Sequence, residues 1–343
     1  MTDLTAFAHG LPKAELHLHL EGMLEPELKF ALAARNGIEL AEKTVEEVRA
    51  TYDFTDLTSF LAVYYPAMQV LQTAEDFHDL AWAYLERAHA QGVVHVEMFF
   101  DPQAHTSRGV PFADVITGYR RAAVRAQDEL GVSAELILCF LRDFSAEYAM
   151  ATLMEALSYK AWIIGVGLDS DERDNPPAKF AAVFARAKAE GFFLTMHCDI
   201  DQVGSVENIR SVLTEIGVDR IDHGTNIVED PALVALAIEK GIGFTTCPVS
   251  NSFVTEQMKA DEIVGLLRQG ARVMVNSDDP AYFGAYVGDN YVALAEHAGL
   301  STADLVQLAV NSFEAAWLTP ARRAAFIARV EEYAAAHDVA LSA

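Results

Sequence analysis

Histidine and aspartate residues stand at the ends of several apolar runs in this sequence. The segments are E-L-H-L-H-L-E-G with His17 and His19, L-T-M-H with His197, R-I-D-H with His223, and N-S-D-D-P with Asp278 and Asp279. An imidazole or carboxylate that is buried without a partner is costly, so such groups usually pair or bind a metal ion. Three imidazoles and one carboxylate suit zinc, which binds nitrogen and oxygen ligands and keeps an open position when it is catalytic.

Short apolar runs alternate with helix-compatible stretches along the chain. The predicted strands are Glu15–Leu20, Val93–Phe100, Ala134–Arg142, Ile163–Leu168, Phe192–Cys198, Arg220–His223, Ile242–Cys247 and Arg272–Asn276. Strands that alternate with helices form parallel sheets, and eight of them indicate a (β/α)₈ TIM barrel of the α/β class. An open doubly wound sheet is the alternative, but no G-x-G-x-x-G turn follows any of these runs.

Two further helical stretches lie outside the simple alternation. The residues between Ile38 and Gln91 predict a helical insertion after strand 1, on the side where a substrate lid is built. The stretch from Thr302 to His337 predicts extra C-terminal helices that pack outside the barrel. No low-complexity linker interrupts the chain, so residues 1–343 are predicted to form one domain.

The barrel prediction gives the polar residues a common place. Active sites of such barrels form at the C-terminal ends of the strands. His17 and His19 alternate in an extended segment, so both imidazoles point to one face. Each segment alone has another interpretation: a chance pair of histidines, a paired core histidine at 197, or a turn at Asp278 and Asp279 before a proline. Their occurrence at the ends of strands one, five, six and eight favours one shared site.

The composition disfavours some classes of binding partner and indicates a compartment. The chain has 50 acidic and 25 basic residues and a formal net charge of -25, which disfavours binding to nucleic acid or to an anionic membrane. The first ten residues lack the basic and apolar regions of a signal peptide, so we expect none, and no run approaches the about 18 apolar residues of a membrane helix. The three cysteines (Cys139, Cys198, Cys247) lie far apart, unlike a disulfide framework, so we expect a cytoplasmic protein.

The motifs resemble those of the adenosine/adenine deaminases of the amidohydrolase superfamily. P-K-A-E-L-H-L-H-L-E-G, R-I-D-H-G, T-C-P-V-S-N and N-S-D-D-P-A-Y-F-G occur in the family's order between about Leu11 and Gly284. The segment F-F-D-P-Q-A-H-T-S-R-G resembles the adenine deaminase subgroup, which acts on the free base.

The resemblance implies a role for each matching residue. His17, His19, His197 and Asp278 would bind one Zn²⁺ per chain. His223 would stand beside the zinc-activated water, and Asp279 would hydrogen-bond N7 of the purine. Glu21 and Gly22 would shape the floor of the base pocket, while Ser250 and Asn251 would organise a loop.

One position departs from the family's pattern. The family carries a glutamate three residues after the fifth-strand histidine, in H-A-G-E, and this glutamate protonates N1; here the position is Ile200. Asp199 or Asp201 can replace this acid, with Asp199 favoured because alternation places it on the same face as His197. Alternatively, the pocket accepts another 6-substituted purine, or the chain binds zinc with little activity. Asp201 is also a candidate helix cap.

The sequence thus predicts a zinc-dependent aminohydrolase that converts adenine to hypoxanthine and ammonia. The alternatives are deamination of N6-alkyl adenines such as cytokinin-like bases, with Tyr64, Tyr65 and Phe253 lining an apolar side pocket, or deamination of adenosine. From another class, a zinc-stabilised binding protein is the rival. The apolar insertion is open to two interpretations, a lid or the contact surface of a homo-oligomer.

Overall fold

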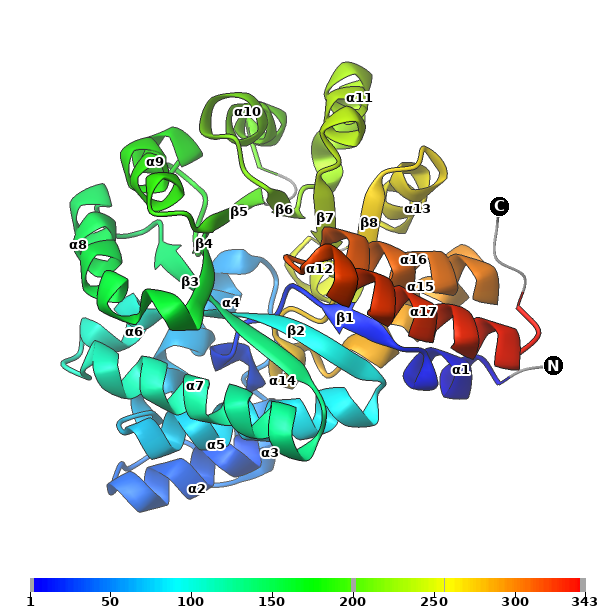
Figure 1. Cartoon of the computed structure of the whole chain (residues 1–343). Helices are drawn as coiled ribbons and strands as arrows, with labels where there is room; N and C mark the ends of the chain where they lie inside the picture. The colour runs from blue at the N-terminus through cyan, green and yellow to red at the C-terminus, as the bar shows by residue number, and fades with distance from the viewer. Residues whose placement is uncertain (1–2, 199–201, 256, 340–343) are drawn as a thin grey trace.

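The computed structural model describes residues 3–198, 202–255 and 257–339. Eight parallel strands follow one another around a single sheet in the order of the sequence (Figure 1). Their bounds are β1 Lys13–Glu15, β2 Val93–Phe100, β3 Ser133–Leu141, β4 Ile163–Asp169, β5 Phe193–Cys198, β6 Arg220–His223, β7 Gly243–Thr246 and β8 Arg272–Val275. The predicted (β/α)₈ barrel is confirmed.

The first predicted strand is wrong in both bounds, because β1 spans Lys13–Glu15 whereas Glu15–Leu20 was predicted. Beyond Glu15 the regular ladder is interrupted: the backbone N–H of Leu16 donates to the side-chain Oδ1 of Asn276 at 2.8 Å instead of to a backbone carbonyl. The chain stays extended, and isolated parallel bridges join Leu18 to Asp278 and His19 to Phe99. The first bridge joins the extension of β1 to the segment after β8, and the second joins it to β2, so the segment that carries His17 and His19 stays in the sheet. The other strands agree with the prediction to within one or two residues at each end.

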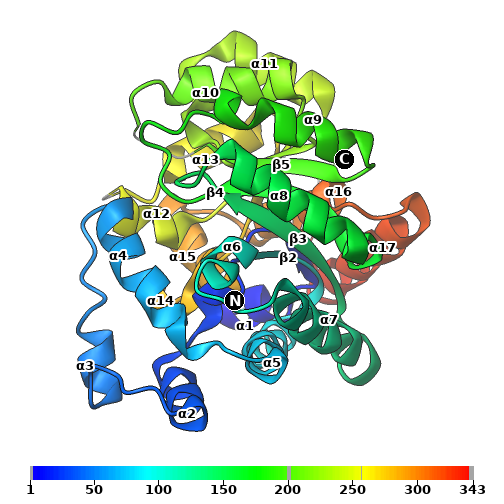
Figure 2. The same cartoon turned by 90° about the vertical axis from the view of Figure 1, so that its left-hand side faces the viewer.

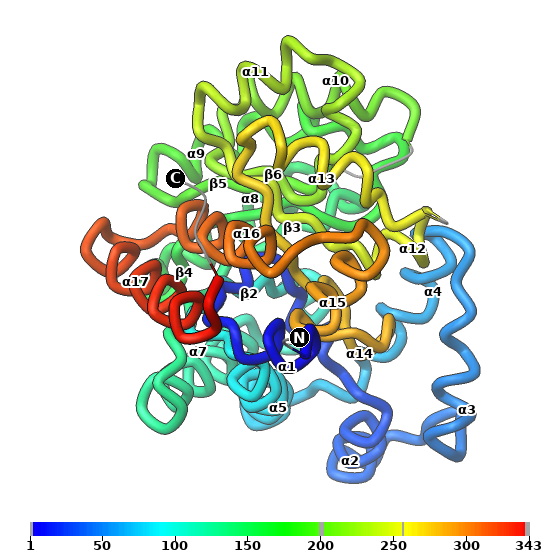
Figure 3. The backbone as a smooth tube through the Cα atoms, turned by 90° about the vertical axis from the view of Figure 1, so that its right-hand side faces the viewer, coloured from blue at the N-terminus to red at the C-terminus, as the bar shows by residue number. Residues whose placement is uncertain are grey.

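Helices surround the sheet on its outer side (Figures 1 and 3). The helices are α1 Leu4–Gly10, α2 Pro26–Asn36, α3 Val45–Arg49, α4 Leu57–Ala67, α5 Ala74–Ala90, α6 Pro102–Thr106, α7 Phe112–Glu129, α8 Ala146–Ala156, α9 Ala181–Ala189, α10 Ser205–Ser211, α11 Pro231–Lys240, α12 Pro248–Val254, α13 Ala260–Arg268, α14 Pro280–Phe283, α15 Val287–Ala298, α16 Thr302–Ala315 and α17 Pro320–Ala336. No helix of the described ranges is long and apolar enough to cross a membrane.

The insertion after β1 is helical but begins earlier than predicted, at α2. Its last helix, α5, packs against α7 and is part of the helical ring around the sheet. Helices α2, α3 and α4 project to one side, with α4 beside α12 (Figures 2 and 3). Aromatic contacts hold α4 there, because the Phe60 ring lies 5.1 Å from that of Phe283 and 5.6 Å from that of Tyr282. The insertion therefore reaches the residues that follow β8.

The C-terminal helices pack outside the sheet, as predicted. Helix α16 lies against β8 and β1, and α17 packs on α16. The barrel interior below the candidate site holds an ion pair, with a guanidinium nitrogen of Arg220 2.6 Å from a carboxylate oxygen of Glu97 and both side chains fully buried. The Trp317 ring lies 4.1 Å from the Arg220 guanidinium, so the turn between α16 and α17 covers this pair.

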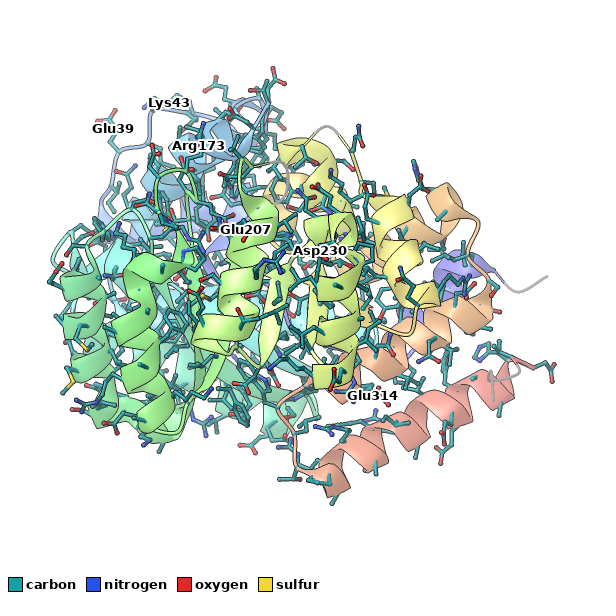
Figure 4. All side chains as sticks on the ribbon, turned by 90° about the horizontal axis from the view of Figure 1, so that it is seen from above. Glu39, Lys43, Arg173, Glu207, Asp230 and Glu314 are labelled. Atoms are coloured by element: carbon teal, nitrogen blue, oxygen red, sulfur yellow. The ribbon has the colours of Figure 1, made fainter. Side chains whose placement is uncertain are left out.

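The acidic character lies on the outer elements. Glu39 follows α2, Glu207 belongs to α10 and Glu314 to α16, and all three point outward (Figure 4). All three cysteines are buried, and none of them forms a disulfide within the described residues. In contrast to these exposed carboxylates, the histidines and aspartates at the carboxyl ends of the strands are buried.

Candidate metal and substrate site

The four residues predicted as metal ligands meet at the carboxyl end of the barrel. The Nε2 atom of His197 lies 3.2 Å from Nε2 of His17 and 3.2 Å from Nε2 of His19. The Asp278 Oδ1 atom is 3.2 Å from Nε2 of His17 and 3.5 Å from Nε2 of His19. Residues more than 250 positions apart in sequence are brought together because β1, β5 and β8 all end on the same side.

The ring orientations point lone pairs at one another. Nδ1 of His17 lies 3.2 Å from the carbonyl of Thr245, and Nδ1 of His197 lies 3.1 Å from the carbonyl of Leu168. A carbonyl only accepts hydrogen bonds, so each Nδ1 carries the hydrogen and each Nε2 carries a lone pair. Two lone pairs 3.2 Å apart repel unless a cation lies between them. Ligands about 2.0–2.1 Å from a tetrahedral zinc are about 3.3 Å from each other, which matches this spacing.

The protonation states agree with metal binding. Burial lowers the pKa of His19 to about 4 and that of His197 well below its usual value, so both imidazoles are neutral. Burial alone would raise the pKa of Asp278, but a proton shared with Nε2 of His17 outweighs burial and holds this pKa well below its usual value. The same contact raises the pKa of His17 against the effect of burial, and a bound cation would take the place of that proton. Neutral imidazoles and an ionised carboxylate are the forms that bind a cation.

Threonine and aspartate side chains support the histidine rings from below. Asp222 is fully buried and accepts hydrogen bonds from the hydroxyls of Thr195 at 2.7 Å and Thr245 at 2.9 Å. Its carboxylate lies 3.6 Å from Nδ1 of His197, and the Thr245 hydroxyl lies 2.8 Å from Nδ1 of His17. Such partners fix the ring orientation of metal-binding histidines. The supporting roles of Asp222, Thr195 and Thr245 were not predicted from the sequence.

Ser250 and Arg142 each hold one of the candidate ligands, Asp278 and His197 respectively. The Ser250 hydroxyl donates to Oδ2 of Asp278 at 2.6 Å, so Ser250 supports a candidate ligand directly. Asn251 does organise its loop, because its side chain donates to the carbonyl of Met258 at 3.3 Å. The buried Arg142 donates to the carbonyl of His197 at 2.8 Å.

His223 lies against the cluster with an unusual backbone. Its Nε2 atom is 3.7 Å from Oδ2 of Asp278, and its ring centroid is 4.6 Å from that of His17. His223 and Asp278 have φ values of 55° and 65°, in the left-handed region that few residues other than glycine adopt. Strain of this kind collects at functional sites. Burial and the charge of His17 lower the pKa of His223 to about 4, and its buried Nδ1 has no hydrogen-bond partner within the described ranges.

Gly22 makes room for Asp279. A Cβ atom at residue 22 would lie 2.0 Å from Oδ1 of Asp279, so only glycine allows this carboxyl group its present place. Burial and the neighbouring Asp278 raise the pKa of Asp279 well above its usual value. A protonated carboxyl group can donate a hydrogen bond to a ring nitrogen. Oδ1 of Asp279 is buried and has no partner among the residues that the structure describes.

Glu21 is placed differently from a pocket-floor residue. Its Oε1 accepts hydrogen bonds from Nε2 of His105 at 2.8 Å and from the Tyr119 hydroxyl at 2.9 Å. The contact ties the segment after β1 to α6 and α7, behind the cavity wall. Substrate contact by Glu21 therefore stays a prediction, whereas its role as an anchor follows from its hydrogen bonds.

A cavity opens beside the cluster. Its walls combine the polar site residues with apolar side chains from the insertion and from the segments after β7 and β8; they are His19, Leu57, Phe60, Leu61, Tyr64, Tyr65, Asp101, Asp169, Ser170, His197, Gln202, His223, Ser250, Val254, Thr255, Asp278, Asp279 and Phe283. Phe253 stacks behind this wall, with its ring 5.2 Å from that of Phe283. Asp101 and Asp169 were not predicted as site residues. The predicted N1 acid, Asp199, lies outside the described residues, as do Ile200 and Asp201.

Comparison with known proteins agrees with this geometry. The adenosine deaminase family model matches residues 12–333. An adenine deaminase of Rhodospirillum rubrum is 50% identical over 95% of this chain and 97% of its own. The crystal structure of an adenine deaminase from Arthrobacter aurescens superposes with a TM-score of 0.91 at 44% identity, covering 95% of this chain and 99% of that one. An amidohydrolase from Burkholderia ambifaria with bound zinc has a TM-score of 0.89 at 29% identity, covering 98% and 95% of the two chains. The chain belongs to the adenosine deaminase family.

Proposed function

We propose that this protein is a zinc-dependent adenine deaminase that converts adenine and water to hypoxanthine and ammonia. The observation that carries the proposal is the set of lone pairs from His17, His19 and His197 that converge with Asp278 beside a cavity. The relatives from R. rubrum and A. aurescens, which match nearly the whole chain, support adenine as the substrate.

The metal would be held by His17, His19, His197 and Asp278. The choice of zinc rests on the nitrogen-rich ligand set and on the zinc in the Burkholderia relative. When bound, zinc polarises a water molecule and lowers its pKa towards 7, so that it attacks at neutral pH. Asp222, Thr245 and Ser250 would orient the ligands through the hydrogen bonds described above.

The residues around the metal would position the purine and move its protons. His223, neutral and adjacent to Asp278, would accept the proton of the attacking water. Asp279, in its protonated form, would donate a hydrogen bond to N7 and hold C6 beside the metal. Asp199 would deliver the proton to N1, because it stands one residue before the position of the family's glutamate, where this chain has Ile200. The proton that His223 holds would then pass to the 6-amino group, which leaves C6 as ammonia.

The cavity favours one second candidate. Its outer wall is made of apolar and aromatic side chains, among them Leu57, Phe60, Leu61 and Val254, and these could surround an apolar group on N6. An N6-alkyl adenine would then be hydrolysed to hypoxanthine and an alkylamine by the same residues.

Steady-state turnover of adenine, adenosine and an N6-alkyl adenine tests these proposals, with amine release measured alongside the zinc content. We expect adenine to have the highest kcat/KM, about one zinc per chain, and loss of activity on chelation with recovery on zinc addition. A preference for the N6-alkyl base would support the second candidate. A zinc-loaded protein that is inert on every purine would overturn both.

A further inference from the structure

Two buried carboxyl groups line the cavity without a role in the reaction proposed above. Asp101 directly follows β2, and Asp169 is the last residue of β4. One carboxylate oxygen of each lies with a ring nitrogen of His19 in a group whose atoms are all within 4.8 Å of one another. The pair is therefore part of the same cavity wall as the candidate metal site.

The two carboxyl groups face each other, but they receive few hydrogen bonds from other residues. Asp101 is 1% exposed and Asp169 is 3% exposed. Oδ1 of Asp101 and both carboxylate oxygens of Asp169 have no hydrogen-bond partner within the described ranges. Buried polar atoms in native proteins are nearly always hydrogen-bonded, so exceptions on a cavity surface indicate a missing ligand group.

The two residues differ in what already holds them. Oδ2 of Asp169 lies 3.4 Å from Nδ1 of His19, outside the geometry of a hydrogen bond but at an ion-pair distance, so this carboxylate faces the ring of a candidate ligand. Asp101 has no such ion pair with a candidate ligand within the described ranges. Its backbone N–H donates to Oε1 of Glu21 at 3.4 Å, and Glu21 is fixed in turn by His105. The backbone of Asp101 is therefore held in place, while its side-chain Oδ1 has no hydrogen-bond partner within the described ranges.

The order of the strands places Asp101 across the barrel from His223, on the side of the cavity that also carries His19. In a ring of eight strands taken in sequence order, β2 faces β6, which carries His223. If C6 lies at the metal and N7 at Asp279, the purine atoms remote from C6 point towards β2. These atoms include N9 and N3. Free adenine carries a hydrogen on N9, whereas a nucleoside carries a carbon substituent there.

We propose that Asp101 accepts a hydrogen bond from the N9–H of the purine and so makes this a site for free bases rather than nucleosides. The inference rests on the proposed purine function and adds the determinant of its substrate class. Replacing N9–H by N9–C would leave the buried oxygen unpaired and crowd it, and sites of this kind discriminate strongly against the analogue that lacks the hydrogen.

The test compares ligands that differ only at N9. Wild type, Asp101→Ala and Asp101→Asn are assayed for turnover of adenine and 9-methyladenine, and for equilibrium binding of hypoxanthine and 9-methylhypoxanthine by calorimetry. Asp128→Asn is the matched control, because Asp128 is exposed near the end of α7, which leads into the opposite end of the barrel. Zinc content and thermal unfolding of each variant establish that it is folded and loaded.

We expect wild type to bind hypoxanthine about 10- to 100-fold more tightly than its 9-methyl analogue, because the analogue leaves a buried hydrogen-bonding oxygen unpaired. In Asp101→Ala the hypoxanthine affinity should fall by a similar factor and the discrimination should shrink to within about threefold. For adenine, KM should rise more than kcat falls, and the isosteric Asn variant should lie between the two.

Three results would overturn the inference. The first is that both Asp101 variants keep the wild-type ratio of affinities for hypoxanthine and 9-methylhypoxanthine. The second is that both ligands lose affinity equally while kcat falls as much as KM rises, and the third is that wild type holds a second zinc ion per chain that the Asp101 variants lack. The binding arm separates this inference from the proposed activity. A protein that releases no ammonia but discriminates at N9 through Asp101 contradicts the deaminase function alone, whereas one that deaminates adenine and 9-methyladenine equally contradicts only the role of Asp101.

Discussion

Substitution of Gly22 by alanine should disable the site without touching a candidate metal ligand. The added Cβ would lie 2.0 Å from Oδ1, 2.7 Å from Cγ and 2.8 Å from Cα of Asp279, while real Cβ atoms essentially never come within 3.0 Å of other heavy atoms. The carboxylate oxygen must therefore move by at least about 1 Å, and because Cα is also too close, rotation of the side chain alone does not relieve the contact. The φ of Gly22 is not in the left-handed region, so the effect comes from the Cβ atom itself.

A displacement of about 1 Å of a substrate-positioning group costs on the order of 10²-fold in rate. We expect kcat/KM for adenine to fall by about that factor in Gly22→Ala, measured by ammonia release, with zinc still bound at saturation. Gly265→Ala is the control, because a Cβ atom at residue 265 in α13 meets nothing within 4 Å. Activity of Gly22→Ala within about threefold of wild type would refute the assignment of Asp279 to the purine, and loss of zinc with unfolding would show that Gly22 serves the fold instead.

The remaining predictions concern an acid, a support and a buried lysine. Asp199→Asn should lower kcat by about 10²-fold if Asp199 protonates N1, whereas Asp201→Asn should not; the opposite result in stopped assays would exchange their roles. Asp222→Asn should weaken zinc affinity by about 10- to 100-fold in competition with a chelator, while Asp219→Asn, at the other end of the barrel, should leave it unchanged; equal affinities would remove Asp222 as a support. Burial lowers the pKa of Lys13 to about 7, so between about pH 7 and 10.5 the unfolded chain binds more protons than the folded one. The free energy of unfolding of wild type should therefore rise with pH in that window relative to that of Lys13→Met, by up to about 1.4 kcal/mol per pH unit. Chemical denaturation measures both, and an equal pH dependence of the two free energies would contradict this prediction.

The alternation of strands and helices could be predicted from the sequence because the apolar runs of the strands and the helical periodicity of apolar residues are both strong, and turn residues separate them. Strands β2 to β8 lie where apolar runs predict them. The first strand was overestimated because an alternating apolar pattern records burial on one face and not hydrogen bonding. Beyond Glu15 the pattern continues while the ladder gives way to the side chain of Asn276.

The candidate ligands were predictable because histidine is rare at the end of a buried strand and the family's motifs mark each position. Their supports were not. Asp222 occurs inside the quoted segment R-I-D-H, but nothing in the sequence says that it meets Thr195 and Thr245 from neighbouring strands. Asp101 likewise occurs in F-F-D-P-Q, where an aspartate before proline is an ordinary turn residue. Its importance depends on a buried, unpaired oxygen that only the three-dimensional structure reveals.

The candidate metal site and the closure of the barrel share the same hydrogen bonds. The backbone N–H of Asp278 donates to the carbonyl of His17 at 3.2 Å, and the N–H of His19 donates to the carbonyl of Asp278 at 3.1 Å. The left-handed backbone at Asp278 turns the chain there, so that its main chain joins the first strand's extension while its side chain reaches the histidines. Aspartate tolerates this conformation better than most residues, which reconciles the backbone with the need for a ligand. A change at Asp278 therefore acts on the junction of β8 with β1 as well as on the metal, and its cost in stability should exceed that of removing a ligand such as His19.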